Sequence, residues 1–337
     1  MSETILLAGG AGFIGSNLAD YLLAESDADI VILDALTYAG NLMNLRNIVN
    51  NTRLRFIHGH IENSEIVNHI CTRYCISGII NAAAETHVDR SIHSAAPFVQ
   101  ANIVGTQVLL DAAVKYGLRF IQISTDEVYG SLGENGTFTE SSPLRPSSPY
   151  SASKAAGDML TLSFVATYGL RASITRCSNN YGAYQFPEKL IPLMICNALE
   201  DKPLPVYGNG NNVRDWIYAR DHVRAIWAAY KFGEPGEVYN IGARCEMRNI
   251  DIVKMILAIL DKPESLIKFT TDRPGHDFRY AIDPSYAEMR LGWKPQAVFA
   301  DALKETVEWY INNDEWLTAA RSGEYRNYYA RQYGKSF

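Results

Sequence analysis

The feature that most limits how this chain can fold is a glycine-rich loop close to its first residue. The segment ILLAGGAGFIGSNLADYLL places Gly9, Gly12 and Gly15 between an apolar strand and an expected helix. Glycines at such a turn let the backbone approach a pyrophosphate closely, and the free N–H groups of the helix N-terminus attract its negative charge. Because the pattern lies in a strand–loop–helix context, it predicts a dinucleotide-binding unit.

An acidic residue at the end of the second apolar segment indicates which dinucleotide is bound. Asp34 follows Gly15 by 19 residues, at the end of the strand-like segment VILD. A carboxylate there accepts hydrogen bonds from the adenosine ribose hydroxyls and repels a 2′-phosphate. The sequence therefore predicts NAD rather than NADP as the cofactor.

Short apolar segments alternate with longer amphipathic segments over the first 180 residues. The segments ILLA, IVIL, RFI, GIIN, RFIQIS and ASITR are expected to be strands, and helical patterns such as Phe98–Tyr116 and Tyr150–Tyr168 lie between them. The strand segments lack period-two alternation, which is typical of strands buried on both faces. This alternation predicts an α/β fold of the Rossmann type, with a doubly wound parallel sheet.

The character of the sequence changes after about residue 180, where loops rich in Gly, Pro and Asn begin. Shorter helical patterns separate these loops, at Pro192–Glu200, His222–Phe232, Ile250–Leu260 and Asp301–Asn312. A chain of 337 residues is long enough for about two domains. We expect residues 1–180 to form the NAD-binding domain and residues 181–337 to form mainly a smaller C-terminal substrate-binding lobe, with some segments returning to the first domain.

Composition argues against several classes of function. The net charge of −6 disfavours nucleic-acid binding, and no apolar run reaches the ~18 residues that a membrane span requires. We expect no signal peptide, because Glu3 stands where a basic segment should be. The five cysteines are scattered without a set of zinc-spaced partners. We therefore expect reduced thiols, no metal site and a cytoplasmic location.

A tyrosine and a lysine mark a possible hydride-transfer site. The segment YSASK places Tyr150 and Lys154 four residues apart at the start of an expected helix, so that they share one face. A tyrosine with its ordinary pKa of ~10 is a poor base at neutral pH, but a nearby ammonium stabilises the phenolate and lowers that pKa. The pair could then take a hydroxyl proton while hydride leaves the same carbon for a nicotinamide.

Two adjacent carboxylates stand where a buried strand is expected to end. The segment STDEVYG follows RFIQI and carries Asp126 and Glu127 side by side. Acidic residues are common where strands turn into loops, and adjacent carboxylates are usually solvated. The heptapeptide alone therefore does not define a site.

Taken together, these motifs resemble those of the extended short-chain dehydrogenase/reductase superfamily. Within it, the dTDP-glucose 4,6-dehydratases have segments similar to STDEVYG, HVDRSI, TRCSNNYG, QFPEKLIPLMI, NVRDWIY and RPGHDFRYAID. The resemblance runs from about residue 4 to residue 312. It implies that a nucleotide-activated glucose is oxidised at C4, loses water across C5–C6, and regains the hydride at C6.

The resemblance also implies roles for the catalytic residues. Glu127 would remove the C5 proton as general base, and Asp126 would protonate the departing C6 hydroxyl as general acid. Thr125 would hydrogen-bond the 4-hydroxyl beside Tyr150 and Lys154. Two close carboxylates in a partly dry site tend to raise one pKa, but the sequence does not show which one.

Further contacts follow from the same resemblance. The cofactor would also touch Phe13, Ile14, Thr37, Ile61 and Ala83. The nucleotide sugar would be held by residues of the strand-end loops and the second lobe, including the cations that a diphosphate needs on an acidic protein: Thr86, Asn179, Glu188, Lys189, Pro205, Tyr207, Arg214, Asn249, Arg273 and His276.

Other functions remain open from the sequence. A 4,6-dehydratase or 4-epimerase of another nucleotide sugar, such as UDP-glucose, would keep Tyr150 and Lys154, although an epimerase has no use for Asp126 and Glu127. A non-catalytic NAD-binding regulator would need none of the four. A homodimer is also expected, because helices at Phe98–Tyr116 and Ser151–Tyr168 pair into a four-helix bundle in this superfamily; their apolar residues are equally compatible with an ordinary core.

Overall fold

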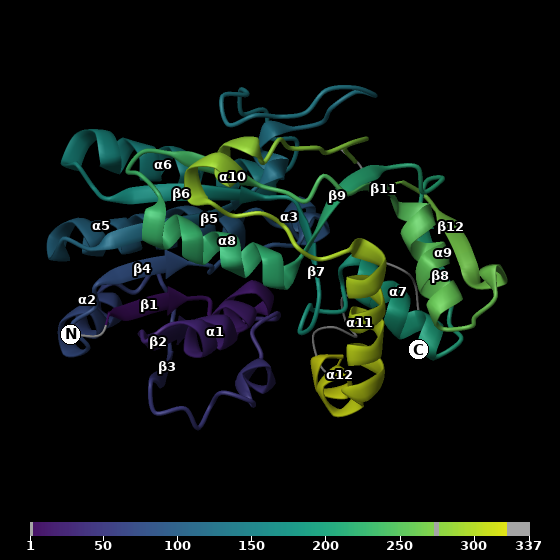
Figure 1. Ribbon diagram of the computed structural model, residues 1–337, viewed down its shortest axis with the longest axis horizontal. Coiled ribbons are helices and arrows are strands. Elements are labelled where there is room, and N and C mark those ends of the chain that lie inside the picture. The colour runs from purple at the N-terminus through teal and green to yellow at the C-terminus, as the bar shows by residue number, and fades with distance from the viewer. Residues whose placement is uncertain (1–2, 273–275, 322–337) are drawn as a thin grey trace.

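A parallel sheet of seven strands forms the centre of the molecule in the computed structural model, which describes residues 3–272 and 276–321. The strands are β1 (Thr4–Ala8), β2 (Asp29–Asp34), β3 (Leu54–His58), β4 (Gly78–Asn81), β5 (Arg119–Thr125), β6 (Ala172–Cys177) and β10 (Val238–Ile241). They pair in the order β10-β6-β5-β4-β1-β2-β3, all parallel (Figure 1). The six strands expected from the sequence and the Rossmann-type fold are confirmed.

Helices cover both faces of this sheet, which explains why its strands are uniformly apolar. Ile5 and Leu7 join a cluster with α1 (Phe13–Glu25), α8 (Ala219–Phe232) and α10 (Ser285–Leu291). Leu6 and Ala8 point the other way, into a cluster with α2 (Ser64–Arg73), α5 (Thr106–Tyr116) and α6 (Pro149–Tyr168). All four side chains are fully buried, as expected for successive residues of a strand that face opposite ways between two layers.

The order of the strands creates a crevice at one edge of the sheet. Strand β1 pairs with β2 on one side and with β4 on the other, so the chain winds outward in both directions from β1. In sheets of this topology ligands bind outside the carboxyl ends of the strands at this switch point. The loops after β1, β2, β4 and β5 are therefore the ones that can reach a bound dinucleotide.

A second layer of elements lies beside the sheet, at the right in Figure 1. It contains a three-stranded sheet, a parallel strand pair and four helices around a separate apolar core. These elements are β7 (Asn179–Tyr181), β9 (Val213–Tyr218) and β11 (Glu246–Arg248), β8 (Leu204–Tyr207) and β12 (Ile267–Thr270), and α7 (Leu190–Leu199), α9 (Asn249–Ile259), α11 (Phe299–Asn312) and α12 (Asp314–Ala320).

Three elements beyond residue 180, β10, α8 and α10, belong to the large sheet rather than to this layer. Strand β10 pairs with β6, and α8 packs against α1 and the sheet. An amphipathic helix such as α8 shows in its sequence that one face is buried, but not which layer buries it. The domain boundary near residue 180 stays a prediction.

The helix expected over Phe98–Tyr116 is interrupted. Helix α3 (Val88–His93) and α4 (Ala96–Val99) precede a π-helical turn at Gln100–Gly105, and α5 follows it. Within that turn, the Asn102 side chain accepts a hydrogen bond from the Glu85 N–H at 2.9 Å and donates to the Glu85 carbonyl at 3.0 Å. The turn thus fixes the loop that follows β4, and π-turns of this kind are frequent at functional sites.

Candidate active site

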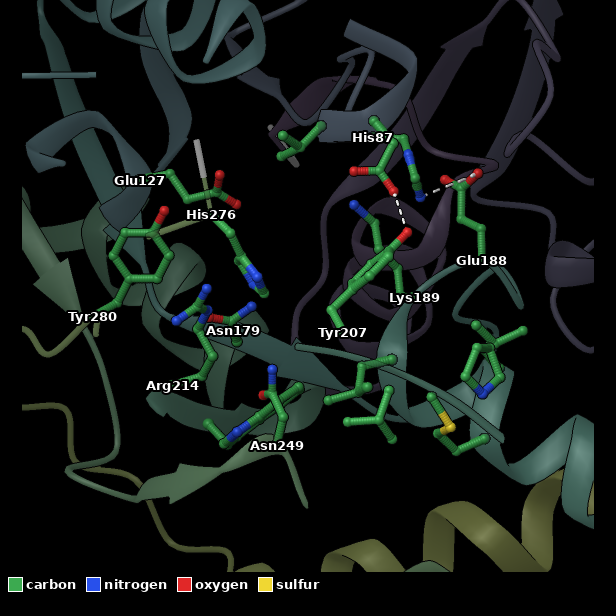
Figure 2. Close-up of a pocket in the computed structure, with 18 residues that line it drawn as sticks. His87, Glu127, Asn179, Glu188, Lys189, Tyr207, Arg214, Asn249, His276 and Tyr280 are labelled. Atoms are coloured by element: carbon green, nitrogen blue, oxygen red, sulfur yellow. Dashed lines mark hydrogen bonds and ion pairs between the residues drawn. The ribbon is translucent and has the colours of Figure 1, made fainter. Parts of the chain in front are cut away.

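A pocket lies between the carboxyl edge of the large sheet and the second layer (Figure 2). In Figure 2, Glu127 and Tyr280 stand on one side of it, and His87 and Glu188 on the other. Most residues predicted to bind the nucleotide sugar line it: Asn179, Glu188, Lys189, Pro205, Tyr207, Arg214, Asn249 and His276.

One predicted substrate residue is placed differently, and another cannot be placed. Thr86 is not among the residues that line the pocket; its hydroxyl lies instead 3.4 Å from the Tyr38 hydroxyl. Arg273 lies outside the described residues. His87, Asp89 and Tyr280 also line the pocket, although the sequence did not lead us to predict substrate contacts for them. His87 and Asp89 belong to the motif HVDRSI and Tyr280 to the motif RPGHDFRYAID, so these motifs could have indicated the contacts.

Arg214 is the best-placed cation for a phosphate. It comes from β9, is only 5 % exposed, and donates to the Asp277 carbonyl at 2.9 Å. Its guanidinium lies 4.4 Å from the centre of the Tyr280 ring, and the Tyr280 hydroxyl in turn hydrogen-bonds Asp277. A guanidinium fixed in this way presents its planar fork in one orientation, which suits bidentate phosphate binding.

The two adjacent carboxylates diverge because the chain bends at the end of β5. Thr125 caps a 3-10 turn at Asp126–Tyr129, and its hydroxyl oxygen accepts a hydrogen bond from the Glu127 N–H at 3.3 Å. The turn sends Glu127 into the pocket, whereas Asp126 is 2 % exposed beside it. Glu127 therefore lines the pocket and Asp126 does not, and their pairing as base and acid stays a prediction.

The pKa of Asp126 is raised by its surroundings. Burial raises it well above the ordinary aspartate value, and the negative charges of Glu127 and Asp215 add to the effect, while Arg214 opposes it. Among the described residues, one oxygen of the Asp126 carboxyl has no hydrogen-bond partner. These surroundings favour the protonated carboxyl, which is the form that a general acid needs.

Tyr150 and Lys154 lie on the first turns of α6, both almost fully buried. The Tyr150 hydroxyl shares a hydrogen bond with Thr125, while Lys154 Nζ donates to the Ile123 carbonyl at 2.6 Å. Burial, followed by the Glu127 charge, raises the pKa of Tyr150, and burial lowers the pKa of Lys154. Burial and Glu127 dominate this shift, and the lowering of the Tyr150 pKa by Lys154 stays a prediction.

Two glycines of the loop, Gly9 and Gly15, are packed too tightly to accept side chains. Gly9 has a φ of +75°, and a Cβ there would come within 2.6 Å of the Ala83 backbone. A Cβ at Gly15 would overlap the Gly9 carbonyl oxygen. Helix α1 starts behind this loop without a side-chain cap and without acidic residues in its first turn. Its N–H groups are thus well suited to a pyrophosphate.

Asp34 lies at the end of β2, next to the glycine loop. It is 8 % exposed, and its carboxylate accepts hydrogen bonds from the N–H groups of Ala11 and Leu36, both at 2.8 Å. A carboxylate at the end of β2 beside a bare glycine loop fits a dinucleotide with free ribose hydroxyls, as in NAD. Nearby, Thr37 is exposed, Ile61 is buried, and Phe13 and Ile14 begin α1.

The described residues contain no group of His, Cys, Asp or Glu side chains arranged to hold a metal ion. None of their helices has the length and apolar character needed to cross a membrane. The doubly wound sheet, the glycine cradle and the Tyr150–Lys154 pair define a class, the NAD-dependent extended short-chain dehydrogenases/reductases.

Comparisons with known proteins identify the family within this class. A model of the family described as GDP-mannose 4,6 dehydratase matches residues 6–306. The chain is 48 % identical to a probable dTDP-glucose 4,6-dehydratase of Sinorhizobium fredii, over 95 % of this chain and 96 % of the other.

Two crystal structures are similarly close. The dTDP-glucose 4,6-dehydratase of Bacillus anthracis, in complex with NAD, is 46 % identical with a TM-score of 0.89, over 95 % of this chain and 100 % of the other. The enzyme of the same name from Streptomyces venezuelae, with NAD bound, is 45 % identical with a TM-score of 0.92, over 94 % and 99 %. The chain belongs to the dTDP-glucose 4,6-dehydratase family.

Proposed function

We propose that the protein converts dTDP-glucose to dTDP-4-keto-6-deoxyglucose with NAD as its cofactor. The observation that carries this proposal is the bend at the end of β5, which buries Asp126 beside a pocket-facing Glu127. Hydride transfer alone has no use for this pair, whereas elimination of water needs both an acid and a base. The names of the relatives support the same reaction.

In the proposed steps Tyr150 takes a proton, Asp126 gives one, and Glu127 does both. Tyr150 and Asp126 return to their starting states by proton exchange with solvent after each turnover. Tyr150 takes the proton of the C4 hydroxyl, which Thr125 orients and the Lys154 charge favours. Glu127 removes the C5 proton, and the C6 hydroxyl leaves as water with the proton of Asp126. Glu127 then returns a proton to C5. When bound, NAD would supply an acceptor for the hydride of C4 and, once reduced, a donor of hydride to C6.

Binding of the nucleotide half is assigned to the second layer. Arg214 and Lys189 supply positive charge for the diphosphate on a protein whose net charge is −6. Asn249, His276 and the strand β8 residues Pro205 and Tyr207 are proposed to hold the nucleoside. The Tyr207 hydroxyl is oriented by a hydrogen bond to the Asp89 carboxylate at 3.1 Å (Figure 2).

Turnover of dTDP-glucose in deuterated water, with only trace added NAD, tests this function. We expect a product that has lost one water and carries deuterium at C5, seen as the loss of the C5 proton signal in the proton NMR spectrum. No NADH should accumulate. Unchanged sugar, or a C4 epimer that keeps its water, would exclude dehydration. UDP-glucose is then the next substrate to try.

A homodimer in the cytoplasm completes the proposal. The segments that pair in this superfamily carry exposed apolar side chains, with Val99 46 %, Met159 64 % and Tyr168 60 % exposed. Burial of such side chains against a second copy would be favourable. The support for the cytoplasm is that all five cysteines are free thiols.

A further inference from the structure

One tyrosine connects the cofactor loop to the loop after β4. Tyr38 belongs to the loop that begins at Asp34 and carries Thr37, both assigned above to the cofactor. The Tyr38 hydroxyl lies 3.4 Å from the Thr86 hydroxyl, and its ring meets Phe186 edge-on with a centroid distance of 5.6 Å. The ring thus touches a segment that reaches the sugar pocket.

An arginine continues this contact into the pocket. The Arg90 guanidinium lies 3.8 Å from the centre of the Tyr38 ring, and its Nε lies 3.4 Å from a carboxylate oxygen of Glu188. Only 1 % of the Glu188 side chain is exposed. Glu188 and Lys189 both line the pocket, and Lys189 donates to the Thr86 carbonyl at 2.8 Å.

The geometry suits an arginine in particular. A guanidinium can stack its flat face on an aromatic ring while an N–H in its plane reaches a carboxylate, which a lysine ammonium cannot do. Arg90 therefore holds a pocket carboxylate and a ring of the cofactor loop in fixed relation. Any movement of Glu188 toward a bound sugar changes the packing of Tyr38.

We propose that Tyr38 and Arg90 are positioning residues that couple retention of NAD to occupation of the sugar pocket, an inference that rests on the proposed function. A sugar hydroxyl bound to Glu188 fixes Arg90, Arg90 fixes the Tyr38 ring, and the cofactor loop stays closed. Such coupling is reciprocal, so NAD also tightens binding of the sugar nucleotide. It serves the reaction, because the hydride removed from C4 must return to the same sugar.

The test measures how fast NAD leaves the holoenzyme. Protein loaded with radiolabelled NAD is chased with excess unlabelled NAD, with and without dTDP-4-deoxyglucose, which lacks the hydroxyl that is oxidised. We expect the analogue to slow release from the wild type at least fivefold. Tyr38→Ala and Arg90→Lys should release NAD faster and show less than twofold slowing, although Arg90→Lys keeps the charge beside Glu188.

Two matched variants separate coupling from general damage. Tyr38→Phe keeps the ring under Arg90 and should retain most of the slowing. Leu42→Ala changes a side chain that is 50 % exposed just after the same loop, and it should behave as the wild type does. Thermal unfolding of each holoenzyme shows whether the variant is folded.

The outcomes distinguish the inference from the function. If the analogue binds in equilibrium dialysis but leaves wild-type NAD release unchanged, the coupling is refuted while the dehydratase assignment stands on product formation. Equal slowing in wild type and Arg90→Lys also refutes it. If the analogue does not bind, the substrate class fails and the coupling fails with it.

Discussion

At the scale of single residues, Asp126 shows how burial sets chemistry. Its raised pKa keeps the carboxyl protonated where an exposed aspartate would be ionised. Asp126→Asn should therefore lower kcat by about 100-fold or more, the usual contribution of a general acid, while NAD stays bound. Steady-state turnover and absorbance of the purified holoenzyme measure both effects. A loss below about threefold would exclude Asp126 as the acid.

The same raised pKa makes a prediction about stability. The pKa of an aspartate in the unfolded chain is ~4, and the pKa of Asp126 in the folded protein is higher. The stabilisation from this difference is fully present below pH ~4 and is lost as pH rises through the raised pKa. Asparagine does not titrate. The free energy of unfolding of the wild type, relative to Asp126→Asn, should therefore fall with rising pH. Urea unfolding at several pH values checks this, and a difference that does not change with pH would contradict it.

Glu188 titrates in a more accessible range. Burial raises the pKa of its carboxyl to about 7, against the opposing charges of Lys189 and Arg90. By the same sign rule, its contribution to stability is present below the ordinary value of ~4.3 and is lost as pH rises through about 7. Glu188→Gln should gain stability over the wild type across that window. Melting curves of both proteins at matched pH values measure the gain. A difference in stability that stays constant with pH would contradict titration of Glu188 in this range.

At the scale of elements, the glycine loop allows a paired test. A Cβ at Gly15 would overlap the Gly9 carbonyl oxygen, whereas one at Gly12 would lie at an ordinary 3.4 Å from that oxygen. Gly15→Ala should destabilise the NAD-free protein by about 1–3 kcal/mol, as overpacking does, and Gly12→Ala by much less. Denaturant unfolding of both variants decides this. Equal losses would mean that the loop can shift.

A buried ion pair links helix α6 to strand β6. Arg176 Nε lies 2.8 Å from a carboxylate oxygen of Asp158, and 2 % and 0 % of the two side chains are exposed. Asp158 lies one helical turn after Lys154 in α6. Arg176→Met leaves a buried carboxylate without its partner and should cost about 3–5 kcal/mol in unfolding free energy. The exposed pair Lys304–Glu308 is the control, where Glu308→Gln should cost under ~0.5 kcal/mol. Similar losses at both sites would contradict the role of burial.

The first six strands of the sheet could be predicted from the sequence, whereas the contacts made by segments far along the chain could not. Strands β1 to β6 are visible because burial on both faces demands uninterrupted apolar residues. Strand β10 has the sequence VYNI, in which Asn240 interrupts the apolar residues, so it lacks that pattern. Asp126 and Glu127 were found by their motif, but the rise in the Asp126 pKa depends on burial and on Asp215, which arrives from β9, far along the chain.

At the scale of the whole molecule, the exposed apolar helix face predicts assembly. Met159 on α6 is 64 % exposed, and a charge there would oppose burial against a second copy. Met159→Glu should shift the protein from dimer to monomer, as measured by light scattering coupled to size-exclusion chromatography. The matched change Met289→Glu, at a side chain 71 % exposed on α10, should leave the mass unchanged. A monomeric wild type would contradict the dimer.

The π-turn at Gln100–Gly105 has a consequence for how this chain can change. A π-turn carries one residue more than the α-helical turn it replaces, so it behaves as a single-residue insertion inside a helix. Deleting one residue there would restore an even helix and satisfy local geometry. It would also rotate Asn102 away from Glu85 by about 100°, the angle of one helical residue. The loop after β4 would then lose its hydrogen bonds to Asn102. We therefore expect a deletion that makes the helix regular to disturb this loop.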